Sequence, residues 1–442
     1  MIRAVNLRGA TAINIITMIG IGPLITIPLV LASLHGPYSL VGWLLGAVLA
    51  LCDGLVWAEL GSAFPGTGGT YTYLLEIFGS GGLGRPLAFL FVWQMIFVVP
   101  LTLASGYIGF ANYAAYFVPA IGASPLVAKA VAIGIGVVTL VALYRGIKTT
   151  AKASVWLGIV AIVTLGSVIL GAYAHFSPHL AMAVAPGDSF WSGMRTGLGA
   201  ALIIAMYDYV GYNQANYVGG EVIDPARTLP RAIVISIVLV AALYVTMQFG
   251  VLGAIPWQSF VPHADGSLPP LGQHLASSVV ERSFGVVAAG VVTALILVTA
   301  FASLYGNLLG GSRIPYAAAA DGNFLKPFAH LHQEQQFPDV ALVVLGALAL
   351  VACLFTLDQV INALTAGIVL IQSVAQIFAL FALRARGVRA PYRMWLFPIP
   401  ALLALGGWLY VFASSGTNAI LFGIASLLAG AVVYGVSRAV AR

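Results

Sequence analysis

The amino-acid sequence predicts an all-α integral membrane protein with twelve transmembrane helices. Of its 442 residues, 61% are hydrophobic and only 7% are charged, which is too little charge to cover the surface of a soluble protein of this size. Apolar runs of about 18 residues or more recur along the chain, each long enough to cross the hydrocarbon core of a bilayer. The runs lack the apolar–polar alternation of β-barrel strands, so we expect helices to satisfy the backbone groups in lipid.

Twelve runs fit this description, and we expect them near residues 11–33, 38–62, 87–117, 126–144, 153–173, 195–218, 231–254, 285–311, 339–357, 359–383, 395–413 and 417–437. The first run is too long for a signal peptide, and no small-residue cleavage site follows it. The loops between the runs are short and leave no room for a soluble catalytic domain. We therefore expect a single transmembrane domain over residues 1–442.

The basic residues predict the orientation of the helices. If the N-terminus is cytoplasmic, 16 of the 19 Lys and Arg residues fall on the inner side, and only Lys129, Arg195 and Arg282 fall outside. The positive-inside rule then predicts a multi-pass protein of the inner (plasma) membrane with both termini in the cytoplasm. The basic residues are spread over many loops, so the net charge of +6 gives no indication of nucleic-acid binding.

The first run is interrupted at its middle by GIGPLITIP, residues 20–28. Gly20, Gly22 and Pro23 stand where a membrane helix is expected to be most regular. One interpretation is close helix packing or a simple kink, since Gly and Pro are common in membrane helices. The other is a broken helix whose freed backbone groups bind a ligand, which is tolerated at membrane depth only around a cavity.

The second run contains two small residues and one acid. Gly42 and Gly46 have the spacing that favours close packing of helices. An acid inside a span is costly and usually faces a cavity or a partner. Asp53 therefore either couples transport to protons or holds a structural contact. Glu59, at the end of the same run, is expected to have a structural role.

The sixth run is also interrupted, by YDYVGYNQANYVGG at residues 207–220. The first and sixth spans, which carry the two interruptions, are five spans apart. Because five is odd, these two spans cross the membrane in opposite directions, so spans 1–5 (residues 10–173) and spans 6–10 (residues 195–385) would form an inverted repeat. Spans 11 and 12 (residues 393–438) would be accessory. Paired interruptions at matching places in two halves are the best sequence indication of a transporter binding site, and they favour the broken-helix interpretation of the first run.

Asp208, inside the second interruption, is the most informative side chain. It is either a contact for a substrate cation or a proton-coupling group, or it is an acid bonded to broken-helix amides that holds the bend. Nearby, at the inner end of spans 6 and 7, Glu221, Asp224, Arg227 and Arg231 form either an inner-gate ion network or a solvated helix start.

Four loop motifs carry a resemblance to a known family: AELGSAFPGTGGTYTYL (58–74), GYNQANYVGGEVIDPARTLPRAI (211–233), GSRIPYAAAADGNFLKPFAHLH (311–332) and ALRARGVRAPYRMWLFPIP (382–400). In this order they resemble the amino acid–polyamine–organocation superfamily and are most similar to L-type amino acid transporters and their bacterial relatives, over roughly residues 8–438. The resemblance implies a LeuT-like fold, with two inverted five-helix repeats, discontinuous spans 1 and 6 and two further helices. It also implies alternating access around a central amino acid site.

The resemblance also implies which residues bind the substrate. In this family, backbone amides of span 1 hold the substrate carboxylate and carbonyls of spans 1 and 6 hold the amine, which suits the charge at helix ends. By position, the substrate-binding residues are Ile21, Gly22, Pro23, Leu24, Thr26, Tyr207, Asp208, Gly211, Tyr212 and Asn307.

Three of these positions depart from the family pattern or set a gate. Tyr207 sits where an aromatic gate closes over substrate, and Tyr212 replaces a tryptophan. Pro23 removes one amide donor. We therefore expect the carboxylate to rely on the amides around Gly22 and Leu24, helped by Thr26.

The sequence leaves several alternatives for the ion that is coupled to transport. We expect Asp53, Asp208, Asn213, Thr299 and Ser303 to act in coupling or gating. Many sodium-independent relatives carry a lysine in span 5, where this chain has Ala161, which puts lysine-based proton coupling in doubt. The alternatives are a sodium ion near Thr299, Ser303 and span 1 carbonyls, a proton, or ion-independent exchange. No other metal or cofactor is expected.

The predicted function is secondary amino acid transport, without enzymatic chemistry and with an L-amino acid carrying a neutral side chain as substrate. A cationic amino acid or polyamine, contacted by Asp208, is the alternative substrate. A channel or a non-transporting nutrient sensor is the alternative class. Animal L-type relatives bind a heavy chain through a loop cysteine after span 3, which is absent here, so we expect no heavy-chain subunit and a monomer or homodimer. Cys52 and Cys353 are expected to be buried residues within spans.

Overall fold

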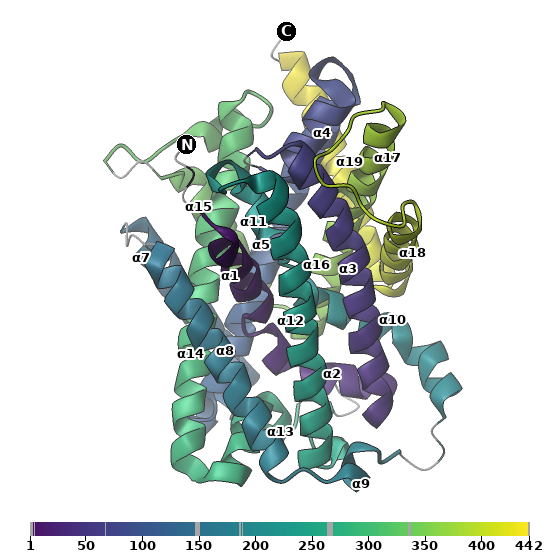
Figure 1. The fold of residues 1–442 in the computed structure, drawn as a ribbon. Coiled ribbons are helices and arrows are strands. Elements are labelled where there is room, and N and C mark those ends of the chain that lie inside the picture. The colour runs from purple at the N-terminus through teal and green to yellow at the C-terminus, as the bar shows by residue number, and fades with distance from the viewer. Residues whose placement is uncertain are drawn as a thin grey trace.

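The computed structural model describes residues 3, 5–66, 68–145, 151–184, 187, 189–262, 268–334 and 337–440. Lys148 and Arg442, two of the basic residues assigned to the inner side, lie outside this part of the chain. The described residues form a bundle of helices with both termini on one side (Figure 1). They contain no strand beyond an isolated parallel bridge between Val5 and Val222, which confirms the all-α class.

The helices of the first half are α1 (Leu7–Ile19), α2 (Gly22–Leu34), η1 (Gly36–Tyr38), α3 (Ser39–Ala63), α4 (Thr70–Phe78), η2 (Gly79–Leu83), α5 (Gly84–Ala114), α6 (Pro119–Ala123), α7 (Pro125–Tyr144), α8 (Ala151–Ala174) and α9 (Pro178–Ala181). The helices that follow are α10 (Phe190–Tyr209), α11 (Gln214–Tyr217), η3 (Gly219–Glu221), α12 (Pro225–Ala254), η4 (Trp257–Ser259), α13 (Pro270–Gln273), α14 (Leu275–Ala320), η5 (Lys326–Ala329), α15 (Asp339–Ala352), α16 (Leu357–Ile368), η6 (Val369–Ala375), α17 (Gln376–Ala385), α18 (Ile399–Ser414) and α19 (Thr417–Val440).

Each of the twelve apolar runs contains a helix. Among the described residues, seven helices are long and apolar enough to cross a membrane, and the bent pair α1 and α2 makes an eighth span. The apolar helices Gly158–Ala174, α15 and α18 are shorter. A multi-pass membrane protein is therefore supported, whereas the count of twelve spans and the inverted repeat stay predictions.

The interruption expected in the first run is present. α1 ends at Ile19, α2 begins at Gly22, and the two helix axes differ by 48°. Gly20 leaves the helical region with φ near 1° and ψ near −145°. Pro23 falls in the first turn of α2, where its ring fits and a helix needs no amide donor.

The interruption in the sixth run is longer. α10 ends at Tyr209, the short helix α11 begins at Gln214, and α12 starts only at Pro225. Gly211 has φ near +130°, a conformation that residues with a Cβ rarely adopt. A Cβ there would also lie 3.0 Å from the backbone of Thr17 and Met18, so the second break packs closely against α1.

Small residues allow close packing of α3 against α10, as the sequence predicts. A Cβ on Gly42 would lie 3.1 Å from that of Ala201, and one on Gly46 would collide with Ala205. At the end of α3, Glu59 accepts hydrogen bonds of 2.7 Å from the Nε and Nη2 atoms of Arg384 on α17. This buried pair gives Glu59 the structural role expected of it.

Candidate functional site

A cavity of about 560 Å³ lies between the two helix breaks. Its walls come from both interruptions and from α5, α14 and α16. Eight of the predicted site residues line it, namely Ile21, Gly22, Tyr207, Asp208, Gly211, Asn213, Ser303 and Asn307. Its lining extends to Tyr71 of α4, Tyr316 of α14 and Pro338 before α15. Of these elements, α4 lies on the side of the molecule that carries both termini (Figure 1).

Hydrogen bonds tie the helices together on the opposite side of the cavity. The Tyr207 hydroxyl at the end of α10 donates to Ser105 Oγ on α5 at 2.9 Å. The Tyr113 hydroxyl, also on α5, donates to the Leu24 carbonyl at 2.9 Å and accepts from the Ala276 amide. We infer that these bonds close the cavity on the side away from the termini. The role of Tyr207 as a gate stays a prediction.

The N-terminal end of α2 offers few free amides to the cavity. Pro23 has none, and the Leu24 amide already donates to the Ile21 carbonyl at 3.1 Å. The expectation that Leu24 supplies a donor is therefore corrected, because its amide closes the first turn of the helix. The amides of Ile21 and Gly22, both residues of the lining, remain as donors for an anion at this helix end.

The Thr26 hydroxyl is also engaged. Thr26 is fully buried and donates to Asp208 Oδ2 at 2.5 Å, so it faces the acid and lies outside the cavity lining. Asp208 is 2% exposed, and its Oδ1 atom has no hydrogen-bond partner among the described residues. This oxygen packs against Gly22, where a Cβ would collide with it. Asp208 is thus held by a hydroxyl of α2, where the structural interpretation expected amides.

Asp53 has a different environment. Its Oδ2 accepts from the Tyr212 hydroxyl at 2.6 Å, and its Oδ1 accepts from Trp408 Nε1 at 3.1 Å. These bonds join α3 to the second break and to α18. Neither Asp53 nor Tyr212 lines the cavity, so the structure favours the structural alternative for Asp53 and directs Tyr212 away from the cavity.

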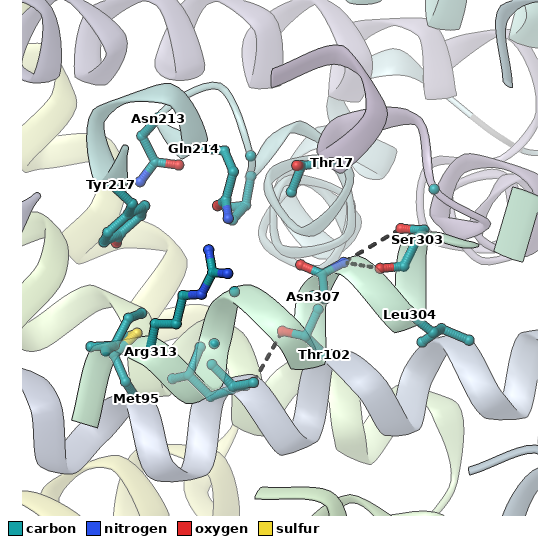
Figure 2. Close-up of a pocket in the computed structure, with 18 of the residues that line it drawn as sticks. Thr17, Met95, Thr102, Asn213, Gln214, Tyr217, Ser303, Leu304, Asn307 and Arg313 are labelled. Atoms are coloured by element: carbon teal, nitrogen blue, oxygen red, sulfur yellow. Dashed lines mark hydrogen bonds between the residues drawn. The ribbon is translucent and has the colours of Figure 1, made fainter. Parts of the chain in front are cut away.

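Of the three polar residues predicted in α14, Ser303 and Asn307 line the cavity and Thr299 does not. Asn307 donates to the Ser303 carbonyl at 3.0 Å, and both residues line the cavity (Figure 2). Ser303 lies beside the first break, since a Cβ on Gly20 would be 3.3 Å from its Oγ. Thr299 is buried outside the lining, and its hydroxyl has no described partner. In the described part of the chain, no group of His, Cys, Asp and Glu residues could hold a metal ion.

The cavity is also lined by Arg313, Gln214 and Tyr217, which the sequence interpretation left out, and by Glu221 of the predicted charged cluster. Arg313 of α14 reaches toward Gln214 and Tyr217 on the opposite wall (Figure 2). Glu221 of η3 lines the same cavity. By contrast, Arg227 lies 4.0 Å from Asp224, with both side chains largely exposed. That pair is a solvated helix start, and only Glu221 of the predicted cluster belongs to the cavity.

Two buried residues that sequence reasoning missed link the breaks to other helices. Asn14 of α1 accepts from the Ala215 amide of α11 at 2.9 Å, and the Tyr244 hydroxyl of α12 donates to the Met18 carbonyl at 2.7 Å. A lone asparagine in an apolar run is a signal that could have identified the first of these, because a buried amide in lipid requires a partner.

Comparisons with known proteins identify a family for nearly the whole chain. Residues 5–435 match the family model described as amino acid permease. The serine/threonine exchanger SteT of Bacillus subtilis (strain 168) is 28% identical over 98% of this chain and 96% of its own length. The human cystine/glutamate transporter is 28% identical over 91% of this chain and 78% of its own length. The mouse b(0,+)-type amino acid transporter 1 is 28% identical over 79% of this chain and 69% of its own length.

Proposed function

Because this chain belongs to the amino acid permease family, we propose that it carries amino acids across a membrane by alternating access around the cavity between its two helix breaks. The observation that carries the proposal is the meeting of both breaks at one cavity. A carrier needs such a site, because its substrate must reach each side of the membrane in turn.

The helix ends around the cavity suit the two charged groups of an amino acid. The N-terminal end of α2 presents the amides of Ile21 and Gly22, which favour a carboxylate. The C-terminal ends of α1 and α10, at Ile19 and Tyr209, carry the negative ends of their dipoles and favour an ammonium group. We place the zwitterion between these three ends.

We propose a neutral side chain for the substrate. Much of the remaining wall is apolar and includes Met95, Val98, Val99, Ala300 and Leu304. The alternative, a cationic amino acid or polyamine, is favoured by Asp208, whose carboxyl group lies at the wall without a cationic partner among the described residues. An Asp208→Asn variant separates the two, because unchanged affinity for Lys and Arg would rule out the cationic version.

We propose that both termini are cytoplasmic, so that the cavity is open to the cytoplasm in this conformation. On the cavity's mouth, Glu221 and Arg313 come from η3 and α14, and no ion pair joins them in the described structure. Closure of the mouth would bring them together as an inner gate. Tyr207 and Ser105 would separate when the other side opens.

We propose that the protein works without a heavy-chain subunit. Its two cysteines, Cys52 and Cys353, are both buried, so neither is placed to form an intermolecular disulfide. A monomer or a homodimer is consistent with this. A sodium ion at Ser303 and the carbonyls of the first break, or a proton, is the proposed coupling ion, and ion-independent exchange is the alternative.

The test is exchange by the purified protein in proteoliposomes preloaded with an L-amino acid. L-serine and L-threonine are the first probes, followed by other neutral and cationic amino acids, with and without sodium. We expect saturable uptake that depends on internal amino acid. Flux that does not saturate would indicate a channel, and binding without flux would indicate a sensor.

A further inference from the structure

The two acids buried among the membrane helices differ in how their oxygens are satisfied. Both carboxylate oxygens of Asp53 accept hydrogen bonds, from Tyr212 and Trp408. Asp208 accepts one, from Thr26 to Oδ2, and its Oδ1 atom is buried without a described donor. Oδ1 of Asp208 is therefore the one oxygen of these two acids that can take up a proton without loss of a described hydrogen bond.

The bare oxygen lies at the helix end where the substrate carboxylate is expected. Oδ1 packs against Gly22, the first residue of α2 and one of the two residues there that still offer an amide. An amino acid held by these amides would bring a second carboxylate close to Asp208. Two carboxylates that share one poorly solvated site cannot both be ionised.

No other ionisable group near Asp208 relieves this conflict. α2 carries none. On its own helix α10, the neighbours are Tyr207 and Tyr209, and on α12 the hydroxyl of Tyr244 donates to the backbone carbonyls of Met18 and Asp208. The remaining ionisable residues on helices packed against α10 include Asp53, Glu59, Arg8, Arg227, Arg231, Asp358 and Tyr410, and none has a described hydrogen bond or ion pair with the Asp208 side chain.

We propose that Asp208 carries one proton for each amino acid that this protein binds, so that transport is amino acid–proton symport. This inference rests on the proposed function. An O–H bond forms at Asp208 Oδ1 when the zwitterion binds, and the proton comes from the solution on the side to which the site is open. The same bond breaks after the substrate leaves, and the proton is released on the other side. One positive charge therefore crosses with each neutral amino acid.

The described conformation has a route for that proton. Asp208 lines the cavity, whose lining extends to Tyr71 of α4 and Tyr316 of α14, and we infer that it is open toward the side of the termini. On the other side, Tyr207 is bonded to Ser105. The proton of Asp208 can therefore exchange only with the solution that the substrate also reaches, which is the condition for coupling two fluxes.

The experiment has two stages in proteoliposomes. The first measures exchange of labelled L-serine, L-threonine and other L-amino acids at equal pH on both sides, which tests the proposed function alone. The second uses the best substrate and measures its accumulation, together with the pH inside the vesicles, after an acidic solution is placed outside. We expect up to about tenfold accumulation for each pH unit of gradient, with acidification of the lumen that depends on the substrate.

Asp208→Asn is expected to retain measurable exchange and lose the proton-driven accumulation. Asp53→Asn, at the second buried acid, is the matched control. Whatever its transport rate, this variant is expected to keep the proton-driven accumulation. If Asp208→Asn does not fold, Thr26→Val keeps the acid, removes its one donor and is expected to shift the pH at which accumulation is half-maximal.

The outcomes separate the two proposals. Exchange without any response to the pH gradient in the wild type, or full proton-driven accumulation by Asp208→Asn, would overturn the proton symport and leave amino acid exchange standing. Absence of exchange for every amino acid would overturn both.

Discussion

The two helix breaks that form the cavity are held in different ways. Between α1 and α2 only Gly20 and Ile21 are non-helical, and among the described residues no side chain bonds to either of them. The break between α10 and α12 is longer and is fixed by side chains. Tyr212 bonds to Asp53, and the Asn216 amide donates to the Trp57 carbonyl at 3.0 Å, which ties this break to α3.

This difference indicates where the structure can bend. No described side-chain hydrogen bond is made at Gly20 or Ile21 themselves, and the bonds to the flanking helices, at Met18 and Leu24, lie on either side of the break. The second break cannot change without loss of several buried hydrogen bonds. We therefore expect the first break to act as a hinge and the second as an anchored wall of the site, and three predictions test that contrast.

The largest effect is expected from Gly211→Ala, in the anchored break. The new methyl group would meet the backbone of Thr17 and Met18 at 3.0 Å, in a residue with φ near +130°. Strain and overpacking together should destabilise the protein by about 2–4 kcal/mol. Thermal unfolding in detergent measures the loss. Gly134→Ala in α7, where a Cβ would meet nothing within 4 Å, is the control and should leave the midpoint the same or slightly higher.

A smaller effect is expected from Asn14→Ala, which removes the acceptor for the Ala215 amide. A buried donor left without a partner costs about 1–3 kcal/mol. Thr17→Ala is the matched control on the same helix, because among the described residues the Thr17 hydroxyl bonds only to the Ile13 carbonyl one turn earlier. Equal destabilisation by the two variants would contradict the view that side chains anchor the second break to α1.

The smallest effect is expected at the cavity mouth. If Glu221 and Arg313 pair when the mouth closes, Arg313→Gln should shift the conformational equilibrium toward the open form by about 0.2–1 kcal/mol. Labelling of a cysteine placed at Gln214, in the lining, measures this shift, since native Cys52 and Cys353 are buried. Glu221→Gln should have the same effect and add nothing in the double variant. Arg227→Gln, from the exposed pair with Asp224, is the control.

Much of the fold could be predicted from the sequence because its features leave either a long apolar run or a glycine at an unusual position. Apolar runs located the helices, and Gly20, Gly22 and Gly211 located both breaks. The packing role of Gly42 and Gly46 is confirmed for the same reason, since a missing side chain matters wherever two helices approach closely.

The details of the site were less predictable. The engagement of the Leu24 amide depends on the turn that the backbone adopts, and no side chain reports it. The bond between Thr26 and Asp208 joins residues 182 positions apart, and a periodic pattern in either helix gives no information about the other. Glu221 was predicted beside Asp224, Arg227 and Arg231, which are close in sequence, whereas the structure brings it to one cavity with the distant Arg313.

The parallel bridge at Val5 has a consequence for how the protein tolerates amino-acid change. The Val5 amide donates to the Glu221 carbonyl at 3.0 Å, and the Val5 carbonyl accepts from the Ile223 amide at 2.8 Å, so main-chain atoms join the segment before α1 to the end of η3 and the residues after it. The Val5 side chain also packs against a small apolar cluster that includes Ala10 and Val222. Nearly any amino acid can supply those atoms, and proline at position 5 is the exception because it has no amide hydrogen. A saturation scan of that position should therefore give its sharpest loss at proline and smaller losses at polar residues, which cannot pack against the apolar cluster. The two main-chain bonds, which join the two interrupted spans on the side of the termini, would appear in such a scan only through proline.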